Sequence, residues 1–231
     1  MVNLREHCAW VHAGDPAGAT RKACEMLRVA VARVRAAEAI HKEEREPARA
    51  ALVVGGGVSG MTAALAIADA GYDVHLVEKS DALGGNLHHV YYVAEGDNPQ
   101  RLLRDLVNRV VAHERIRLFL GSEVTHHTGS VGDFRAVIRR GPGEGRLEEL
   151  RHGVTIMATG GGEASSPRYL LGQDRRVVRQ SDLEELLAHD PERAAQLRSV
   201  VMIQCVQAED APEYCSRVCC LNTIKNALRL K

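Results

Sequence analysis

The sequence predicts an α/β fold built on a parallel sheet and preceded by a long N-terminal helix. Three observations carry this prediction: an apolar run that ends in a glycine-rich turn, a helical pattern directly after the turn, and a second apolar run after the helix. A strand, a helix and a second strand form the unit from which parallel sheets are built. At 231 residues the chain has room for a sizeable core and for one to two domains.

The N-terminal helix is predicted from about Pro16 to Glu46, after an irregular stretch over residues 1–14. Apolar residues recur there at steps of three and four, which gives the helix one apolar face. Asp15 or Thr20 is the expected cap, and Pro47 follows the expected end. We interpret this segment as a packing arm.

Short apolar runs and turn residues predict the remaining elements. Strands are expected at residues 50–54, 73–77, 116–120, 123–127, 134–139, 147–151, 154–158 and 200–205. Helices are expected at residues 58–70, 101–113, 182–188 and 212–230, and residues 81–98 are expected to form a loop. The predicted domains are an N-terminal segment with its helical arm (1–48), an α/β domain (49–198) and a strand–helix segment that carries clustered cysteines (199–231).

The charge balance argues against nucleic acid and anionic membranes as partners, because Lys plus Arg number 30 and Asp plus Glu also number 30. The first ten residues lack the apolar stretch of a signal peptide, and the long uncharged window at residues 50–68 is interrupted by Gly55-Gly56-Gly57. We therefore expect no membrane span and a cytoplasmic protein. In that compartment clustered cysteines bind metals or do redox chemistry more often than they form disulfides.

Gly55, Gly57 and Gly60 form a G-x-G-x-x-G pattern between the first strand and its helix. In Rossmann-type folds the first glycine permits the tight turn, the second lets backbone N–H groups approach a pyrophosphate, and the third lets the helix lie close to the strand. The helix N-terminus adds partial positive charge. Glu78 ends the next strand, 21 residues beyond Gly57, where it can accept hydrogen bonds from ribose hydroxyls and disfavour a 2′-phosphate. The nucleotide is therefore predicted to be FAD or NAD.

Two further stretches favour FAD. VEKSDALGGNL (77–87) resembles the E-K…G-G stretch of two-dinucleotide-domain flavoproteins, and VTIMATGG (154–161) resembles their later A-T-G strand, which passes near the flavin. The resemblance implies a Rossmann-like FAD-binding fold of that type. It also implies further cofactor-binding residues, at Lys79, Gly85, Asn86, Thr159 and Gly160.

Four of the six cysteines lie within the last 27 residues: Cys205, Cys215, Cys219 and Cys220. Asp210 and Glu213 form a D-x-x-E capping box, which predicts a helix that begins just before Cys215. Cys215 and Cys219 would share one face of that helix, and Cys205, at the end of a buried strand, would lie over its N-terminus, where thiol pKa values are lowered. Four thiolates suit a [4Fe-4S] cluster or zinc, although the spacing lacks the paired C-x-x-C knuckles usual for zinc.

These motifs together resemble the heterodisulfide reductase A family, which includes bacterial homologues. The matching stretches, in the order of that family, are LREHCAWVH (4–12), ALVVGGG…LGGNL (51–87), GSVGDF (129–134), VTIMATGG (154–161) and VVMIQC…YCSRVCCLNTIKNA (200–227). The resemblance implies that the four clustered cysteines bind a [4Fe-4S] cluster beside FAD. It also implies an electron-transfer component of a larger heterodisulfide reductase-like complex, whose electron carriers would be ferredoxin, a hydrogenase or an NADH-oxidising subunit.

Members of that family usually continue past this helix, complete the FAD domain and carry C-x-x-C-x-x-C motifs, which this sequence does not contain. We therefore expect an incomplete fold, truncated at both ends relative to the family. Two alternatives stay open: a simple FAD/NAD(P)H-dependent oxidoreductase without a cluster, and a truncated, non-catalytic scaffold subunit. The sequence identifies no catalytic residue.

The remaining thiols and histidine pairs have simpler interpretations. Cys8 is expected to be a buried or free thiol, and Cys24 is expected to be a packing thiol on the N-terminal helix. The pairs His88-His89 and His126-His127 make poor metal chelates, because adjacent residues on a strand point to opposite faces.

Overall fold

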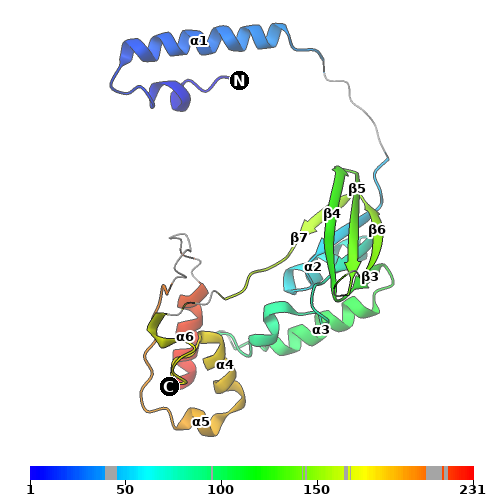
Figure 1. Cartoon of the computed structure of the whole chain (residues 1–231), viewed down its shortest axis with the longest axis vertical. Helices are drawn as coiled ribbons and strands as arrows, with labels where there is room; N and C mark the ends of the chain where they lie inside the picture. The colour runs from blue at the N-terminus through cyan, green and yellow to red at the C-terminus, as the bar shows by residue number, and fades with distance from the viewer. Residues whose placement is uncertain are drawn as a thin grey trace. The chain divides into compact units, whose positions relative to one another are not determined.

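The computed structural model describes residues 1–39, 46–94, 96–141, 143, 145–163, 166, 168–206, 215 and 218–231. The chain divides into two compact units, Met1–Arg45 and Glu46–Lys231. The helices and strands of both are labelled in Figure 1. No helix in the described part of the chain is long and apolar enough to cross a membrane.

The first unit contains a π-helical turn, η1 (Arg5–Ala9), and one long helix, α1 (Pro16–Arg35). Asp15 caps α1 as predicted, since its carboxylate accepts a hydrogen bond of 2.8 Å from the backbone N–H of Gly18. The helix ends at Arg35 and residues 37–39 are not helical, so the prediction of a helix up to Glu46 is wrong.

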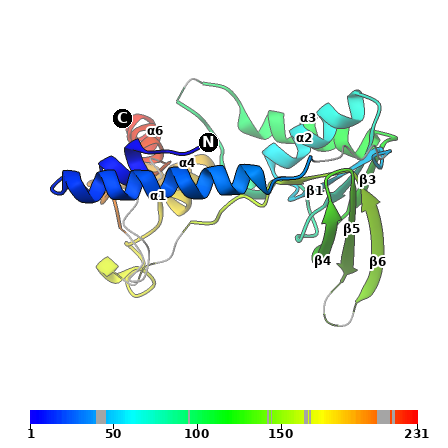
Figure 2. The same cartoon turned by 90° about the horizontal axis from the view of Figure 1, so that it is seen from above.

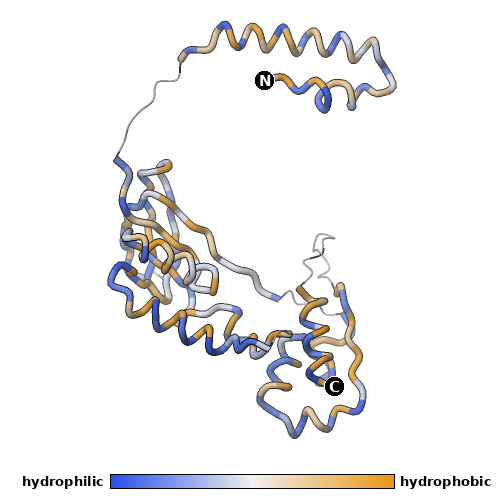
Figure 3. Tube along the Cα trace, turned by 180° about the vertical axis from the view of Figure 1, so that it is seen from behind, coloured by the Kyte–Doolittle hydropathy of each residue, from blue (hydrophilic) through white to orange (hydrophobic). Residues whose placement is uncertain are grey.

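Cys8 and the apolar side chains of α1 differ in burial. Cys8 is buried, and its Sγ donates to the backbone carbonyl of Ala19 at 3.0 Å, which confirms a buried thiol. Cys24 is exposed, so the prediction of a packing thiol is not met within the described residues. Figure 3 shows apolar residues recurring along α1, and several of them stay exposed: Leu27, Val29, Val31 and Val34.

The second unit is built around a parallel sheet with the strand order β3-β2-β1-β7. The strands are β1 (Ala50–Val54), β2 (Asp73–Val77), β3 (Ile116–Phe119) and β7 (Val154–Met157). The helix α2 (Val58–Asp69) connects β1 to β2, and α3 (Pro99–Ala112) precedes β3. This arrangement confirms the predicted Rossmann-like α/β fold.

A second, antiparallel sheet has the order β4-β5-β6 and consists of β4 (Ser122–Ser130), β5 (Asp133–Arg140) and β6 (Arg146–His152). Figure 2 shows α2 and α3 on one side of the parallel strands and β4–β6 on the other. Alternate residues of β1 divide between the two resulting cores. Val53 packs with Met61 and the other side chains of the helical face, whereas Leu52 packs with Ile138 and the antiparallel sheet.

The remaining elements are the 3₁₀ turns η2 (Gly85–His89) and η3 (Arg168–Leu170) and the helices α4 (Gln180–His189), α5 (Pro191–Ala195) and α6 (Val218–Leu230). Residues 200–206 form no strand and expose Val201 and Ile203, so the predicted buried strand at 200–205 is wrong. A parallel strand needs a neighbour for its backbone hydrogen bonds, and none lies beside this segment in the described chain. The capping box of Asp210 and Glu213 lies outside the described residues.

A buried polar network holds α6 against α4 and the loop that follows η2. Lys225 Nζ lies 2.7 Å from Glu184 Oε2, and the two side chains are 9% and 3% exposed. Glu184 Oε1 accepts a hydrogen bond of 2.8 Å from the backbone N–H of Tyr91. Tyr92 Oη donates to Asn226 Oδ1 at 2.8 Å, and Asn226 Nδ2 donates to the Gln180 side chain at 2.8 Å. The helix that carries two clustered cysteines is thus tied to the loop next to the glycine-rich region.

Candidate functional site

The glycine-rich loop leaves β1 at its carboxyl end and enters α2. Gly55 has φ +108°, a conformation that favours glycine, and a Cβ there would clash with the backbone oxygen of Ala158 after β7. A Cβ at Gly60 would clash with the backbone oxygen of Gly55, so the close approach of α2 to β1 requires glycine. Two of the three predicted glycine roles, the tight turn and the close helix packing, are therefore visible in the backbone.

Gly57 differs from the other two glycines, because a Cβ there would meet no described atom within 4 Å. It is the N-cap of α2, and no side chain caps the helix at this position. The first N–H groups of a helix have no partner within the helix and, together with the helix dipole, attract phosphate. The open face at Gly57 is therefore the place where a pyrophosphate can approach the backbone.

Glu78 lies directly after β2 and is fixed against this loop. Its Oε2 accepts a hydrogen bond of 2.5 Å from the Gly56 N–H, and its Oε1 accepts one of 2.7 Å from the Ser80 N–H. Partial burial opposes ionisation of Glu78, but the hydrogen bonds from the Ser80 and Gly56 backbone outweigh it and lower the pKa of the carboxyl group. Each carboxylate oxygen retains acceptor capacity for a further donor such as a ribose hydroxyl.

The segment after Glu78 folds back over the glycine loop. Gly84 pairs with Gly57 in an isolated parallel bridge, and its N–H donates to the Gly56 carbonyl at 2.9 Å. Gly85 has φ +50° and lies against the Gly57 backbone. Asn86 Nδ2 donates to the Gly161 carbonyl at 2.6 Å, which joins this segment to the loop after β7.

The structure therefore brings most of the predicted nucleotide residues to one edge of the sheet. Thr159 and Gly160 are exposed at the end of β7, beside the β1 loop. Strands β2 and β3 lie on one side of β1 and β7 lies on the other, so the crevice at the carboxyl ends of β1 and β7 is the topological switch point where doubly wound sheets bind ligands. Lys79 points elsewhere, because its Nζ pairs with Glu123 of β4 at 3.2 Å.

The four clustered cysteines come from three pieces of chain. Cys205 is exposed and has φ +57°, which is unusual for a residue other than glycine. Cys215 is exposed and not helical, so its predicted place on the helix is wrong. Cys219 and Cys220 lie in the first turn of α6, and Cys219 is half-buried.

The thiols nevertheless lie within electrostatic range of one another. Cys219 raises the pKa of Cys220, and Cys215 and Cys205 add to this effect, because a thiolate is disfavoured beside other thiolates. The prediction that the helix N-terminus lowers the thiol pKa values is thus wrong for Cys220. Among the described side chains, no three His, Cys, Asp or Glu residues already stand in a metal-binding arrangement. The four thiols converge without forming a closed site, and their chemistry fits a cationic cluster that thiolates ligate.

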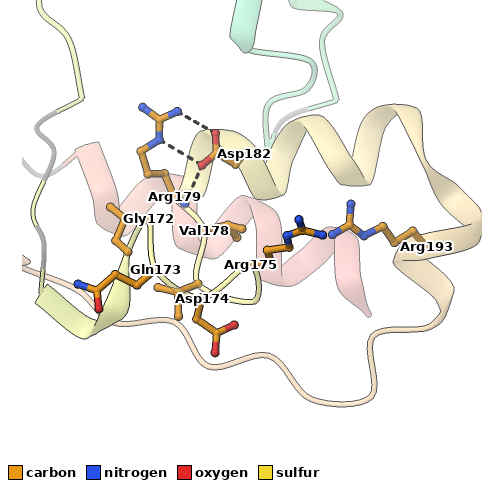
Figure 4. Close-up of a pocket in the computed structure, with 10 residues that line it drawn as sticks. Gly172, Gln173, Asp174, Arg175, Val178, Arg179, Asp182 and Arg193 are labelled. Carbon is orange, nitrogen blue, oxygen red and sulfur yellow. Dashed lines mark hydrogen bonds and ion pairs between the residues drawn. The ribbon is translucent and has the colours of Figure 1, made fainter.

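Sequence reasoning missed three features of this unit. It did not predict the buried pair of Lys225 and Glu184, although charged residues at helical spacing in an apolar helix were visible. It did not predict that His127 of β4 meets His152 of β6. It also did not predict a cavity of about 610 Å³ beside α4, which Figure 4 shows with the Arg179–Asp182 ion pair of 2.9 Å at its rim. That cavity contains none of the predicted site residues.

Comparisons with known proteins agree with the fold. The family of the NAD(P)-binding Rossmann-like domain matches residues 53–106. The A subunit of the ferredoxin/F(420)H(2)-dependent CoB-CoM heterodisulfide reductase of Methanosarcina acetivorans is 28% identical, and the alignment covers 100% of this chain and 40% of that protein. The iron-sulfur A subunit of the CoB-CoM heterodisulfide reductase of Methanocaldococcus jannaschii is 26% identical, with 100% of this chain and 49% of that protein covered. The second of the corresponding iron-sulfur A subunits of Methanopyrus kandleri is 40% identical over 62% of this chain and 22% of that protein.

The chain thus spans less than half the length of these relatives. The alignment with the Methanosarcina acetivorans protein has 321 positions against the 231 residues of this chain, so the relative carries additional residues inside the aligned region.

The parallel sheet, the glycine loop and the acidic residue after β2 define a dinucleotide-binding oxidoreductase of the Rossmann type. The similarity over the full chain identifies it further: the chain is a homologue of the A subunit of heterodisulfide reductase.

Proposed function

We propose that this chain is the FAD-binding, [4Fe-4S]-carrying electron-transfer part of a heterodisulfide reductase-like oxidoreductase. The observation that carries the proposal is the combination of a pre-formed nucleotide loop with four converging thiols on one unit of one chain. When bound, FAD supplies two-electron redox chemistry and the cluster supplies one-electron transfer.

The residues divide the binding tasks. The backbone at Gly57 and the N-terminus of α2 receive the pyrophosphate, while Gly55 and Gly60 hold the turn and the helix in place. Glu78 accepts the ribose hydroxyls, and its lowered pKa keeps it ionised for this role. Gly85, Asn86, Thr159 and Gly160 line the crevice on the side of the nucleotide that continues toward the flavin. Lys79 is retained as a candidate only for an outer contact, because it pairs with Glu123.

Cys205, Cys215, Cys219 and Cys220 are the proposed cluster ligands. Their convergence raises the pKa of Cys220, and a bound cluster relieves the repulsion between thiolates because its iron ions are cationic. The segment from Cys205 to Cys220 closes around the cluster, while the network of Lys225 and Glu184 keeps α6 in position. The domain boundaries at residues 48/49 and 198/199 belong to the same proposal.

The partners follow from the relatives. Their names describe subunits of heterodisulfide reductase complexes, some with ferredoxin or hydrogen as electron source. We place this chain in an analogous cytoplasmic complex, with ferredoxin, hydrogenase or NADH-oxidising subunits as electron carriers. Six free thiols are consistent with a reducing compartment.

Anaerobic reconstitution tests the proposal. The full chain is incubated with FAD, iron and sulfide, desalted, and analysed for flavin, iron and acid-labile sulfide per chain. We expect one flavin, four irons and four sulfides. Flavin without iron would support a simple FAD oxidoreductase instead, and the absence of both cofactors would support a scaffold subunit.

A further inference from the structure

Three metal-ligating atoms from three strands meet between the two sheets of the second unit. His127 Nε2 of β4 lies 3.3 Å from His152 Nε2 of β6. The hydroxyl oxygen of Thr155, on β7, lies 2.8 Å from each of these nitrogens. The three atoms therefore form a small triangle whose corners belong to three different strands.

Hydrogen bonding alone leaves this triangle incompletely satisfied. The Thr155 hydroxyl has one proton, and each neutral imidazole has one N–H, which can sit on either ring nitrogen. If His152 donates to the hydroxyl and the hydroxyl donates to His127, the contact between the two imidazole nitrogens has no proton to share. A cation within reach of all three atoms satisfies every lone pair at once.

The spacing matches that of ligands on a single transition-metal ion. Imidazole nitrogens bind zinc at about 2.0–2.1 Å, so two of them at a near-tetrahedral angle lie about 3.3 Å apart. His127 and His152 have this separation. Zinc and related divalent ions favour imidazole, and an oxygen or a water completes such sites.

The fold fixes the two imidazoles in position. The register of β4 on β5 shifts between Val124 and His126, and the irregularity sets which of the two adjacent histidines reaches Thr155. Phe134 of β5 belongs to the same ring cluster, with ring centroids 4.9 Å from His127 and 5.6 Å from His152. His152 is fully buried whereas His127 is exposed, so the triangle is accessible from the side of His127.

We propose that His127, His152 and Thr155 form a binding site for one divalent transition-metal ion of the zinc class, separate from the cysteine segment. The ion would join the antiparallel sheet to β7 of the parallel sheet. The proposal does not depend on the binding of FAD or of a cluster.

Titration of the full chain with Co²⁺ tests the site, with Zn²⁺ competition and the Zn²⁺-induced rise in Tm as second readouts. Cys205, Cys215, Cys219 and Cys220 are replaced by Ser in a parallel variant, so that binding to thiolates is removed. We expect this four-serine variant to bind one Co²⁺ without the thiolate charge-transfer bands. In the same background His127→Ala should weaken binding by more than about tenfold, since loss of an outer-shell partner alone typically costs 10–100-fold.

Two variants complete the design. His126→Ala is the matched control, because it removes the adjacent histidine on the same strand and should leave the affinity unchanged. Thr155→Val keeps the shape of the side chain and should weaken binding less than His127→Ala does. The proposal is overturned if the four-serine variant binds no Co²⁺, or if His127→Ala and His126→Ala bind it equally well.

Discussion

The glycine loop and the cysteine segment are both predicted cofactor sites, yet they differ in how completely the chain alone builds them. At the glycine loop, three glycines, the Glu78 carboxylate and the Gly84 bridge fix the backbone through contacts within the described chain. At the cysteine segment, Cys205 and Cys215 lie on exposed, non-repetitive backbone, and only Cys219 and Cys220 sit on a helix.

The difference teaches that a dinucleotide site and a cluster site draw their order from different sources. The nucleotide contacts backbone groups that the sheet and helix already hold in place. Cluster ligands are side chains on several segments, and metal binding commonly supplies part of the folding free energy of such sites. We therefore expect the glycine loop to keep its shape without FAD and the cysteine segment to become ordered with its cluster.

The largest expected effect is on cofactor content at the cysteine segment. Cys219→Ser should abolish the bound iron and the brown absorbance after anaerobic reconstitution, because one of four thiolate ligands is lost. Cys24→Ser removes an exposed thiol on α1 and serves as the matched control, with full iron content expected. Equal iron in the two variants would exclude Cys219 as a ligand.

The next largest effect concerns the network between the two regions. Lys225→Met should lower the free energy of unfolding by about 3–5 kcal/mol, because Glu184 is left as a buried charge without its partner. Chemical denaturation measures this value. Lys79→Met breaks an exposed ion pair and should cost about 0–1 kcal/mol. In the double variant Lys225→Met with Glu184→Leu, most of the loss should be recovered, and a loss as large as in the single variant would contradict this explanation.

The glycine loop separates stability from binding. Gly60→Ala should destabilise the protein by about 2–3 kcal/mol, because its Cβ clashes with the Gly55 carbonyl and forces α2 away from β1. Gly57→Ala should change stability by about 0.5 kcal/mol or less, since its Cβ points into open space. It should still weaken FAD binding, measured by fluorescence titration, because the methyl group stands where the pyrophosphate approaches. Normal FAD affinity in Gly57→Ala would argue against this approach path.

The smallest effect is a pH dependence from Glu78. Its folded pKa is lowered below the ordinary value of 4.5, so the carboxylate contributes stability above that pH, and the contribution is lost as pH falls through the folded pKa. The unfolding free energy of the wild type should therefore decline more steeply below about pH 4.5 than that of Glu78→Gln. Glu114→Gln, a change at an exposed glutamate, should follow the wild type.

The sequence predicts the glycine loop much better than the cysteine segment, and the reason is physical. Local rules govern the loop: an apolar strand, glycines at fixed offsets and an acid after the next strand, all within about 30 residues. The apolar run at 200–205 carries a strand pattern, but a strand also needs a neighbour, and pattern cannot report whether one is present. Ile203 is accordingly exposed.

Other differences arise where local patterns are silent. The helical periodicity continues past Arg35, and no glycine or proline marks the observed end of α1. The pair His126-His127 reads as a poor chelate from its alternation on a strand, whereas the register shift near His126 and the distant His152 are properties of the folded sheets. The ion pair of Lys79 with Glu123 likewise depends on how β4 lies beside β2.

The central claim is that FAD and a [4Fe-4S] cluster sit on one chain close enough to exchange electrons. Anaerobic photoreduction of the flavin in the reconstituted chain, followed by EPR spectroscopy at low temperature, tests it directly. We predict that the signal of a reduced [4Fe-4S] cluster grows as electrons leave the flavin, and that Cys219→Ser retains the photoreduced flavin without this signal. A wild-type chain that holds both cofactors but leaves the cluster oxidised while the flavin stays reduced would contradict the account.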